Sequence, residues 1–290
     1  MCLIKTVAVV NDLSSFGNCS LTAAVAILAA MGHRPCPLPT AVLSAQSEFE
    51  RFYRRDLTDD LPRWLDAWQA NGERFDGICT GYFSAAGQLD SALRLIRGFR
   101  ADGGVVIVDP VMGDDGALYP GFDRDVCRGM RRLAAQADVL LPNVTELCLL
   151  SGADYAALSQ ADNLLPQIEA LAKPLAAGRG VVVTGIHCHH QIGNLVISGG
   201  EARLIACEKL GGRFSGTGDL FSAVVSGCVL NGKTLFQAAQ TAADFVHAAI
   251  AETVRAPHNP LYGVRFENVL HLLTEVTTHA NNKSTDKKQN

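Results

Sequence analysis

The sequence predicts an α/β fold around a mostly parallel central sheet that is buried on both faces. Short apolar runs rich in β-branched residues alternate along the chain with longer segments of helical period. The runs are apolar throughout, which is typical of parallel strands buried on both faces. The chain has 290 residues and 48% hydrophobic content, enough for a sizeable core. Because no internal repeat or long linker interrupts the pattern, we expect a single domain over residues 1–278.

The apolar runs give the expected strands in chain order: residues 4–10, 77–80, 105–108, 139–141 and 181–184. A further strand region precedes "SAQS" at residues 44–47. From Leu220 to about Thr278 the pattern is helical throughout, with breaks at "NGK" and "APHNP". The polar tail, residues 279–290, has no periodicity, so we expect it to be disordered.

Composition favours a cytoplasmic protein with small-molecule partners. The formal charge is −4, with 25 basic and 29 acidic residues well mixed, so neither a nucleic-acid nor a membrane partner is expected. The nine cysteines include no CxxC pair, which favours a reducing compartment. The longest apolar helical stretch, "LTAAVAILAAM" from Leu21, is too short to span a membrane.

Polar residues follow the expected strands. Asn11 and Asp12 follow the first, "TGYF" includes the end of the third, and Asp109 with "PVMGDDGALY" follows the fourth. "PNVTE" and then Thr184 with Gly185 follow the next two. Because ligands of open α/β sheets bind beyond the carboxyl ends of the strands, these residues predict a site at one edge.

The stretch "GTGDLF" points to phosphate chemistry. Gly216, Thr217 and Gly218 stand at the expected start of a helix, where free N–H groups and the helix dipole attract an anion. Asp219 then falls in the first turn and is a candidate general base. Phosphoryl transfer requires mainly positioning and charge neutralisation, so this loop, one acid and a metal ion nearly suffice. A plain helix cap is the alternative.

Two other glycine patterns are rejected. "GCVLNGKT" at residues 227–234 fits a Walker A loop formally, but a buried helix rather than a strand precedes it, so we interpret it as a helix end. A dinucleotide fingerprint fails because Phe221 occupies the third glycine position of "GTGDLF", which argues against an oxidoreductase.

Oxygen ligands for magnesium are present. Asp109 ends an apolar strand, and Asn143 and Glu146 are three residues apart at a helix start, on one helical face. A local helix cap formed by Asn143 and Glu146 is the alternative for that pair.

Taken together, six motifs resemble pyridoxal, pyridoxine and pyridoxamine kinases of the ribokinase-like superfamily. They run, between about Val7 and His247, as "VNDLSSFGNCSLT", "PLPTAVLS", "TGYF", "VDPVMGDDGALY", "LLPNVTE" and "FSGTGDLFSA". The resemblance implies a ribokinase-like α/β/α fold, magnesium ATP as phosphate donor and the 5′-hydroxymethyl group of a vitamin B6 vitamer as acceptor. We also expect a homodimer, and leave a potassium requirement open.

The resemblance assigns roles residue by residue. Asp219 resembles the catalytic base, with Gly216, Thr217 and Gly218 as the anion hole. The residues that resemble contacts of ATP, its phosphates and magnesium are Asp109, Asp114, Tyr119, Asn143, Glu146 and Thr184, with Asp109 and Glu146 expected nearest the metal. Those expected to line the pyridine pocket are Asp12, Thr40 and Tyr82.

One departure concerns the acceptor. Relatives have "SNHT" where this chain has "SAQS", so Ala45 and Gln46 replace an asparagine and a histidine. We expect a roomier pocket that gains a neutral amide and relies on Asp12, favouring an acceptor that bears an amine. A hydroxymethylpyrimidine kinase is therefore the alternative function. A non-catalytic binding protein is disfavoured, because Asp219, Asp109 and Glu146 are all present. "HCHH" at residues 187–190 is expected to be a loop after a strand rather than a metal site.

Overall fold

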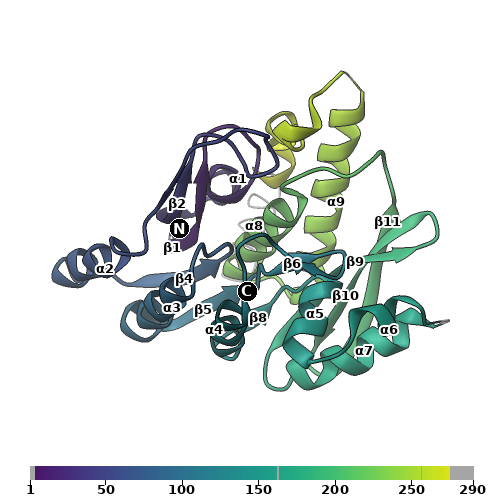
Figure 1. Ribbon diagram of the computed structural model, residues 1–290, viewed down its shortest axis with the longest axis horizontal. Coiled ribbons are helices and arrows are strands. Elements are labelled where there is room, and N and C mark those ends of the chain that lie inside the picture. Colours follow the sequence, from purple (N-terminus) through teal and green to yellow (C-terminus); the bar gives the residue numbers. More distant parts are fainter. Residues whose placement is uncertain (1–3, 162, 256, 275–290) are drawn as a thin grey trace, which may run out of the picture.

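The computed structural model describes residues 4–161, 163–255 and 257–274, so the tail predicted at residues 279–290 lies outside the described residues. Within these ranges a nine-stranded sheet has the order β11-β10-β9-β8-β5-β4-β1-β2-β3, and a separate pair joins β6 and β7 (Figure 1). The strands are β1 (Thr6–Ser14), β2 (Arg34–Leu43), β3 (Arg54–Asp56), β4 (Phe75–Thr80), β5 (Arg100–Val108), β6 (Gly113–Asp114), β7 (Ala117–Leu118), β8 (Val139–Leu140), β9 (Gly180–Cys188), β10 (Gln191–Ser198) and β11 (Glu201–Glu208).

Helices cover both faces of the sheet (Figure 1). They are α1 (Ser20–Ala30), α2 (Leu61–Ala70), α3 (Ala86–Phe99), α4 (Arg124–Ala134), α5 (Val144–Ser151), α6 (Tyr155–Ser159), α7 (Leu164–Leu175), α8 (Thr217–Leu230) and α9 (Leu235–Val254), followed by the 3₁₀ turns η1 (Pro260–Tyr262) and η2 (Glu267–Val269). One apolar core lies under α1, α8 and α9, and the other under α2, α3, α4, α5 and α7.

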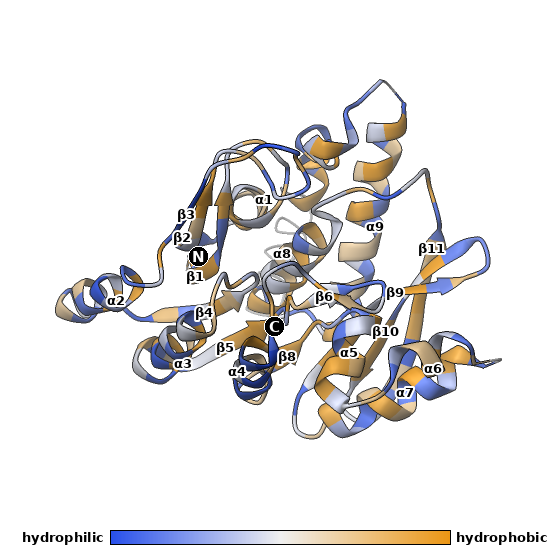
Figure 2. Ribbon diagram, in the orientation of Figure 1, coloured by the Kyte–Doolittle hydropathy of each residue, from blue (hydrophilic) through white to orange (hydrophobic). Residues whose placement is uncertain are grey.

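Side chains of the central strands alternate between the two cores. In β1, Val7 and Val9 belong to the α1–α8–α9 core, whereas Ala8 and Val10 belong to the opposite core, as the two-residue period of a strand requires. Figure 2 shows the central strands as largely hydrophobic and the helices as mixed, with hydrophilic residues along parts of them. This arrangement confirms the predicted α/β/α layers.

The central strands pair in parallel, and the antiparallel pairs lie at the two ends of the sheet. Strands β2, β1, β4, β5, β8 and β9 form consecutive parallel pairs. At one end β3 pairs antiparallel with β2, and at the other β10 pairs antiparallel with β9 and β11. The prediction of a mostly parallel sheet is confirmed.

Three regions differ from the expectation. The strands are longer than the apolar runs, since β9 continues to Cys188 and β1 to Ser14. The sequence did not predict β10 and β11, which form a hairpin around Gly199 and Gly200. Helix α9 ends at Val254, before the break predicted at "APHNP", but beyond that break the chain forms the short turns η1 and η2 where the helical pattern was expected to resume.

The strand order reverses at β1. The chain passes from β1 to β2 on one side, then crosses back to β4 and continues through β5, β8 and β9 on the other. In open α/β sheets the crevice at such a switch point, beyond the carboxyl ends of the strands, is where ligands bind. The loops after β1, β4 and β5 meet there.

Candidate active site

Asp219 lies in the first turn of α8, directly after a glycine in the left-handed conformation. Gly216 is the N-cap residue with φ 82°, and a Cβ atom built there would lie 2.3 Å from the carbonyl oxygen of Asn18. Only glycine accommodates both the dihedral angle and the contact. The N–H groups of Thr217, Gly218 and Asp219 precede the first intrahelical bond, which Leu220 N–H donates to the Gly216 carbonyl. The predicted anion-binding loop and base therefore share one helix start.

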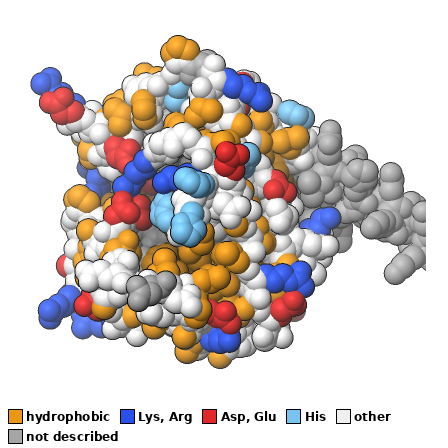
Figure 3. All heavy atoms as spheres, turned by 90° about the vertical axis from the view of Figure 1, so that its right-hand side faces the viewer, with side chains coloured by type: hydrophobic (Ala, Val, Ile, Leu, Met, Phe, Trp, Pro, Cys, Tyr) orange, Lys and Arg blue, Asp and Glu red, His pale blue; other side chains and the backbone are white. Residues whose placement is uncertain are grey.

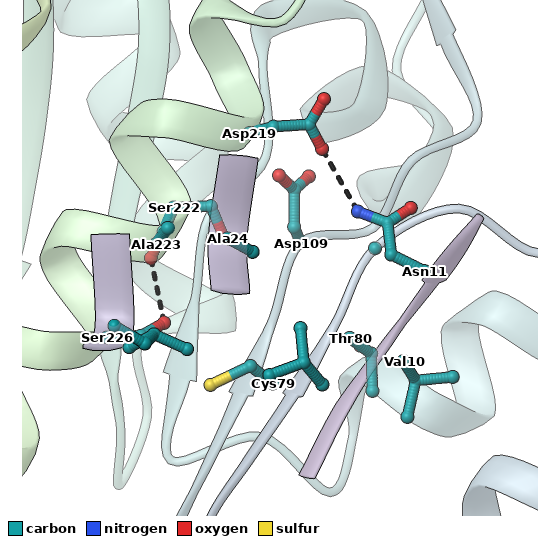
Figure 4. Close-up of a pocket in the computed structure, with 13 residues that line it drawn as sticks. Val10, Asn11, Ala24, Cys79, Thr80, Asp109, Asp219, Ser222, Ala223 and Ser226 are labelled. Carbon is teal, nitrogen blue, oxygen red and sulfur yellow. Dashed lines mark hydrogen bonds between the residues drawn. The ribbon is translucent and has the colours of Figure 1, made fainter. Parts of the chain in front are cut away.

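Asn11, in the second half of β1, contacts Asp219 (Figure 4) and links it to Asp12 and to the loop that follows β4. Its amide Nδ2 donates to Oδ1 of Asp219 at 3.0 Å. Its Oδ1 accepts the N–H groups of Asp12 at 3.0 Å and of Tyr82 at 2.9 Å. The sequence placed Asn11 at the end of the first strand but gave it no role. Its position directly before Asp12 was the available signal.

The acids predicted for the metal and the base lie together in a poorly solvated region. Burial, then Glu146 and Asp219, raise the pKa of Asp109 well above its usual range. Burial and then Asp12 raise the pKa of Asp219 to about 6, against the hydrogen bonds from the Ser20 backbone N–H and from Asn11. Figure 4 shows the Asp109 and Asp219 carboxylates lying near one another above a small pocket lined by Thr80, Cys79 and Ser226. Negative charge concentrated in this way favours a bound cation.

Asn143 and Glu146 form a capping box at the start of α5. Asn143 Oδ1 accepts the Glu146 N–H at 2.9 Å, and Glu146 Oε2 accepts the Asn143 N–H at 2.8 Å. Glu146 Oε1 accepts the Met112 N–H at 3.1 Å, and Asn143 Nδ2 donates to the Gly113 carbonyl at 2.8 Å. The cap considered as an alternative is thus present. It also fixes the segment that leads from Asp109 into β6.

Burial dominates the ionisation of Glu146. It raises the pKa of the carboxyl group to about 8, with the backbone hydrogen bonds from Asn143 and Met112 opposing the rise. Its two oxygens accept the backbone N–H groups of Asn143, Met112 and Gly113, which leaves lone-pair capacity for one further contact. The geometry therefore leaves room for a contact to water or to a cation.

Three further residues predicted at the nucleotide side border this acid cluster. Asp114 lies in β6 and forms an ion pair with Arg213. Tyr119 donates its backbone N–H to the Met112 carbonyl at 3.0 Å, and burial, then the charges of Glu146, Asp114, Asp109 and Asp219, raise the pKa of its hydroxyl. Thr184 lies in the middle of β9, is partly exposed and forms a parallel bridge with Asn143.

Of the three residues predicted to line the acceptor pocket, Asp12 and Tyr82 lie beside Asn11, whereas Thr40 lies behind the Tyr82 loop. Asp12 is 7% exposed, and its Oδ2 accepts the Ser14 hydroxyl at 2.8 Å. Tyr82 is partly exposed and stacks on Phe122 with ring centroids 5.6 Å apart. Thr40 is fully buried and donates its hydroxyl to the Tyr82 carbonyl at 2.9 Å. Thr40 therefore supports the Tyr82 loop from behind.

The expectation for Gln46 needs a correction. Gln46 is 5% exposed, its Nε2 donates to the Leu261 carbonyl at 3.2 Å, and its Oε1 accepts the Glu48 N–H at 2.9 Å. The amide is engaged by backbone groups and is not an open polar group of the pocket. It joins the loop after β2 to η1.

The Walker-like motif and the "HCHH" segment both lie where a helix or strand ends in a turn. Lys233 is in the short connection between α8 and α9, where Gly232 has φ 78° and Thr234 caps the next helix. "HCHH" forms the end of β9 and the turn into β10, with His187, His189 and His190 exposed. Figure 3 shows histidine side chains gathered on this side of the molecule. In residues 4–161, 163–255 and 257–274, no group of three or more His, Cys, Asp or Glu side chains is arranged to hold a metal ion.

A three-layer α/β/α fold, an anion-binding helix start and an acid beside it define a ribokinase-like small-molecule kinase. The chain belongs to the phosphomethylpyrimidine kinase family, which matches residues 74–261. It is accordingly a phosphotransferase that acts on an alcohol group.

Relatives resemble the chain over most of its length. A pyridoxine/pyridoxal/pyridoxamine kinase of Bordetella avium is 30% identical over 263 residues, which cover 87% of this chain and 86% of the relative. The pyridoxal kinase of Lactobacillus plantarum has a TM-score of 0.88 and 31% identity, covering 96% of this chain and 99% of that one. A Bacteroides thetaiotaomicron protein described as a phosphomethylpyrimidine kinase, crystallised with pyridoxal, has a TM-score of 0.88 and 33% identity, covering 93% and 96%.

No helix in the described part of the chain is both long and apolar enough to cross a bilayer.

Proposed function

We propose that the protein transfers the γ-phosphoryl group of ATP to the 5′-hydroxymethyl group of a vitamin B6 vitamer: pyridoxal, pyridoxine or pyridoxamine. The observation that carries the proposal is the position of Asp219, at the start of α8 and joined through Asn11 to Asp12 and Tyr82. An acid so placed lies between an anion-binding helix start and the loops of the switch point. The B6 kinases among the relatives support the same acceptor class.

In this proposal, Asp219, the start of α8 and Asn11 have separate roles. Ionised Asp219 accepts the proton of the acceptor hydroxyl as that oxygen attacks the γ-phosphorus. The backbone N–H groups at the start of α8 hold the transferring phosphate, with the positive end of the helix dipole behind them. Asn11 keeps the carboxylate oriented and links its position to the acceptor loops.

Magnesium fits the acid cluster. Burial raises the pKa values of Asp109 and Asp219, and the charges of Glu146 and Asp219 raise that of Asp109 further. Asp109, and Glu146 through its remaining lone pair, would hold Mg²⁺ together with the phosphates and water, because magnesium needs few protein ligands when phosphates supply the rest. The ion would offset negative charge on the phosphates.

A panel of acceptors tests the proposal. ADP release is measured with ATP and pyridoxal, pyridoxine, pyridoxamine or hydroxymethylpyrimidine, with magnesium and after its removal by a chelator. The family name points to a pyrimidine substrate, so hydroxymethylpyrimidine is the second candidate acceptor. Turnover with a B6 vitamer that disappears without magnesium supports the proposal, whereas turnover of the pyrimidine alone assigns the protein to the second function. Replacing potassium by sodium in the same assay shows whether turnover requires potassium.

We further propose a homodimer in the cytoplasm. Phe52 and Tyr53 are 39% and 68% exposed beside the edge strand β3, whose three residues are all exposed. An exposed edge next to aromatic side chains is a surface that a second copy could cover. The eight described cysteines are free, which suits a reducing compartment. Light scattering of the purified protein measures its mass, and a monomer at micromolar concentration would contradict the dimer.

A further inference from the structure

Arg213 joins two segments that are about a hundred residues apart in sequence. Its Nη1 lies 2.7 Å from Oδ2 of Asp115, and its Nη2 lies 2.9 Å from Oδ2 of Asp114. Arg213 belongs to the loop between β11 and α8, three residues before Gly216. The two acids belong to the β6–β7 hairpin. One guanidinium therefore spans from the anion-binding loop to the hairpin.

The other side of the hairpin is tied to the predicted nucleotide residues. The Gly113 carbonyl accepts the Asn143 amide at 2.8 Å, and the Gly116 N–H donates to Thr145 Oγ1 at 2.9 Å. Arg213 thus connects the α8 side of the site to a hairpin that is fixed on the α5 side. A triphosphate held between the start of α8 and the acid cluster would lie beside this connection.

The ion pairs are exposed. The side chain of Arg213 is 64% exposed, and those of Asp114 and Asp115 are 39% and 71% exposed. Exposed pairs of this kind add little to folding stability. A guanidinium binds phosphate and carboxylate oxygens through the same fork of N–H groups, so a phosphate can replace a carboxylate at little cost. These ion pairs are therefore better suited to exchanging a carboxylate for a phosphate than to holding the loop and the hairpin together.

We propose that Arg213 is an ATP-binding residue that exchanges partners. In the free protein Asp115 and Asp114 hold its guanidinium beside the phosphate site, and bound ATP takes the guanidinium from Asp115. Asp115 then competes with the triphosphate for Arg213. The inference rests on the proposed use of ATP and adds a residue that the motifs did not assign.

Three variants separate exchange from bracing. Arg213→Gln removes the charge and keeps a long polar side chain. Asp115→Asn removes the competing charge, and asparagine tolerates the φ of 49° found there. Arg128→Gln is the matched control, since Arg128 forms a similar exposed pair with Asp125 within α4. Calorimetry measures the dissociation constants of magnesium ATP and of adenosine for each, and thermal melts confirm folding.

If Arg213 exchanges partners, Arg213→Gln and Asp115→Asn should change the affinity for magnesium ATP in opposite directions. Arg213→Gln should weaken magnesium ATP binding about tenfold and leave adenosine binding unchanged, as expected for one lost charge-assisted contact. Asp115→Asn should strengthen ATP binding several-fold, and this gain should vanish in the double variant. Arg128→Gln should match the wild type.

Other outcomes overturn the inference in distinguishable ways. If Arg213→Gln and Asp115→Asn weaken ATP binding alike, the pair is a brace. If Arg213→Gln binds ATP like the wild type, or loses adenosine affinity equally, Arg213 does not bind the phosphates. A wild-type protein that binds no magnesium ATP overturns the proposed donor and this inference together, whereas the preceding results leave the proposed function intact.

Discussion

The amide of Asn11 donates a hydrogen bond of 3.0 Å to the carboxylate of Asp219, across 208 positions of sequence. The contact joins the second half of β1, in the sheet, to the start of α8, in one of the helical layers that cover it. Because Asn11 Oδ1 also accepts the N–H groups of Asp12 and Tyr82, the orientation of the base is coupled to the acceptor loops. Moving one amide should therefore impair catalysis while leaving the core unchanged.

Gly81→Ala tests this coupling. A Cβ atom at Gly81 would lie 2.5 Å from Nδ2 of Asn11, so the amide must shift away from Asp219. We expect kcat/KM to fall about tenfold, the scale of one lost hydrogen bond to a charged group, with a melting temperature within a few degrees of wild type. The control is Gly98→Ala in α3, where an added Cβ meets no atom within 4 Å. Unchanged kinetics in Gly81→Ala would show that Asn11 does not orient the base.

Asp219→Asn should keep the fold and lose the base. The amide is nearly isosteric and lies in a partly exposed first turn of α8, but it cannot accept the acceptor's proton. We expect kcat to fall by about 10² to 10⁴, the usual contribution of a positioned base. Circular dichroism checks the fold, and near-normal turnover with a B6 vitamer would remove Asp219 from this role.

The same residue predicts a pH dependence. Burial raises the pKa of Asp219 to about 6, and only its ionised form can act as a base. In the wild type, kcat/KM should therefore rise with pH up to about 6 and level off above it. A rate that stays constant from pH 8 to pH 5 would exclude titration of the base in this range.

The central strands were predictable because their signal is local. Apolar runs such as residues 105–108 and 181–184 lie within β5 and β9 of the buried sheet. The strand β2 was harder to predict, because prolines at positions 35, 37 and 39 interrupt the apolar pattern that is typical of a buried strand. The prolines occupy alternate positions, and all three are paired in register with residues of β1. β10 and β11 were missed although Gly199 and Gly200, both with positive φ, are a typical two-residue hairpin turn.

The site was predictable only in part, for a physical reason. Residues at strand ends, such as Asp109 and Asp12, can be assigned to one edge by the geometry of a parallel sheet. The partners of a side chain depend on the tertiary fold. Nothing local shows that Asn11 reaches Asp219, that Arg213 pairs with Asp114 and Asp115, or that the Gln46 amide binds Leu261.

Lys233→Ala tests the rejected Walker motif. Lys233 follows α8 at the end opposite Asp219, and a helix of 14 residues is about 21 Å long. We expect ATP turnover within a few-fold of wild type. A loss of ATP turnover of a hundredfold or more in the folded variant would contradict this assignment and favour a P-loop.

His33 predicts a loss of stability in mild acid. The ring is 7% exposed, its Nε2 lies 3.1 Å from the Gly227 carbonyl, and its buried Nδ1 has no hydrogen-bond partner. Burial lowers the pKa of His33, so the unfolded chain binds the proton more readily. The stabilisation is complete above the unfolded pKa of about 6.5 and is lost as pH falls through the lower folded pKa.

Urea melts of wild type and His33→Gln at pH 8 and pH 5 measure this effect. The raised pKa values of Asp109, Glu146 and Asp219 act in the opposite sense, since groups of that kind stabilise the fold at low pH and lose the contribution as pH rises. The informative quantity is therefore the difference between the two proteins. Wild type should lose more stability than His33→Gln on going to pH 5, and equal losses would exclude His33 as the cause.

Asp12→Ala tests which acceptor the pocket prefers. An ionised carboxylate can accept a charge-assisted hydrogen bond from an amino group, worth about 1.5 to 3 kcal/mol, whereas an aldehyde offers no such donor. We therefore expect wild type to use pyridoxamine or the aminopyrimidine alcohol at least as well as pyridoxal, and Asp12→Ala to lose that preference.

The competing role for Asp12 is a brace, since it is buried and accepts the Ser14 hydroxyl at 2.8 Å. Ser14→Ala is the matched control because it removes the brace and keeps the carboxylate. If Asp12 binds the amine, only Asp12→Ala changes the ranking of kcat/KM values among the four alcohols. If it braces the loop, both variants lower the melting temperature and the ranking stays as in wild type.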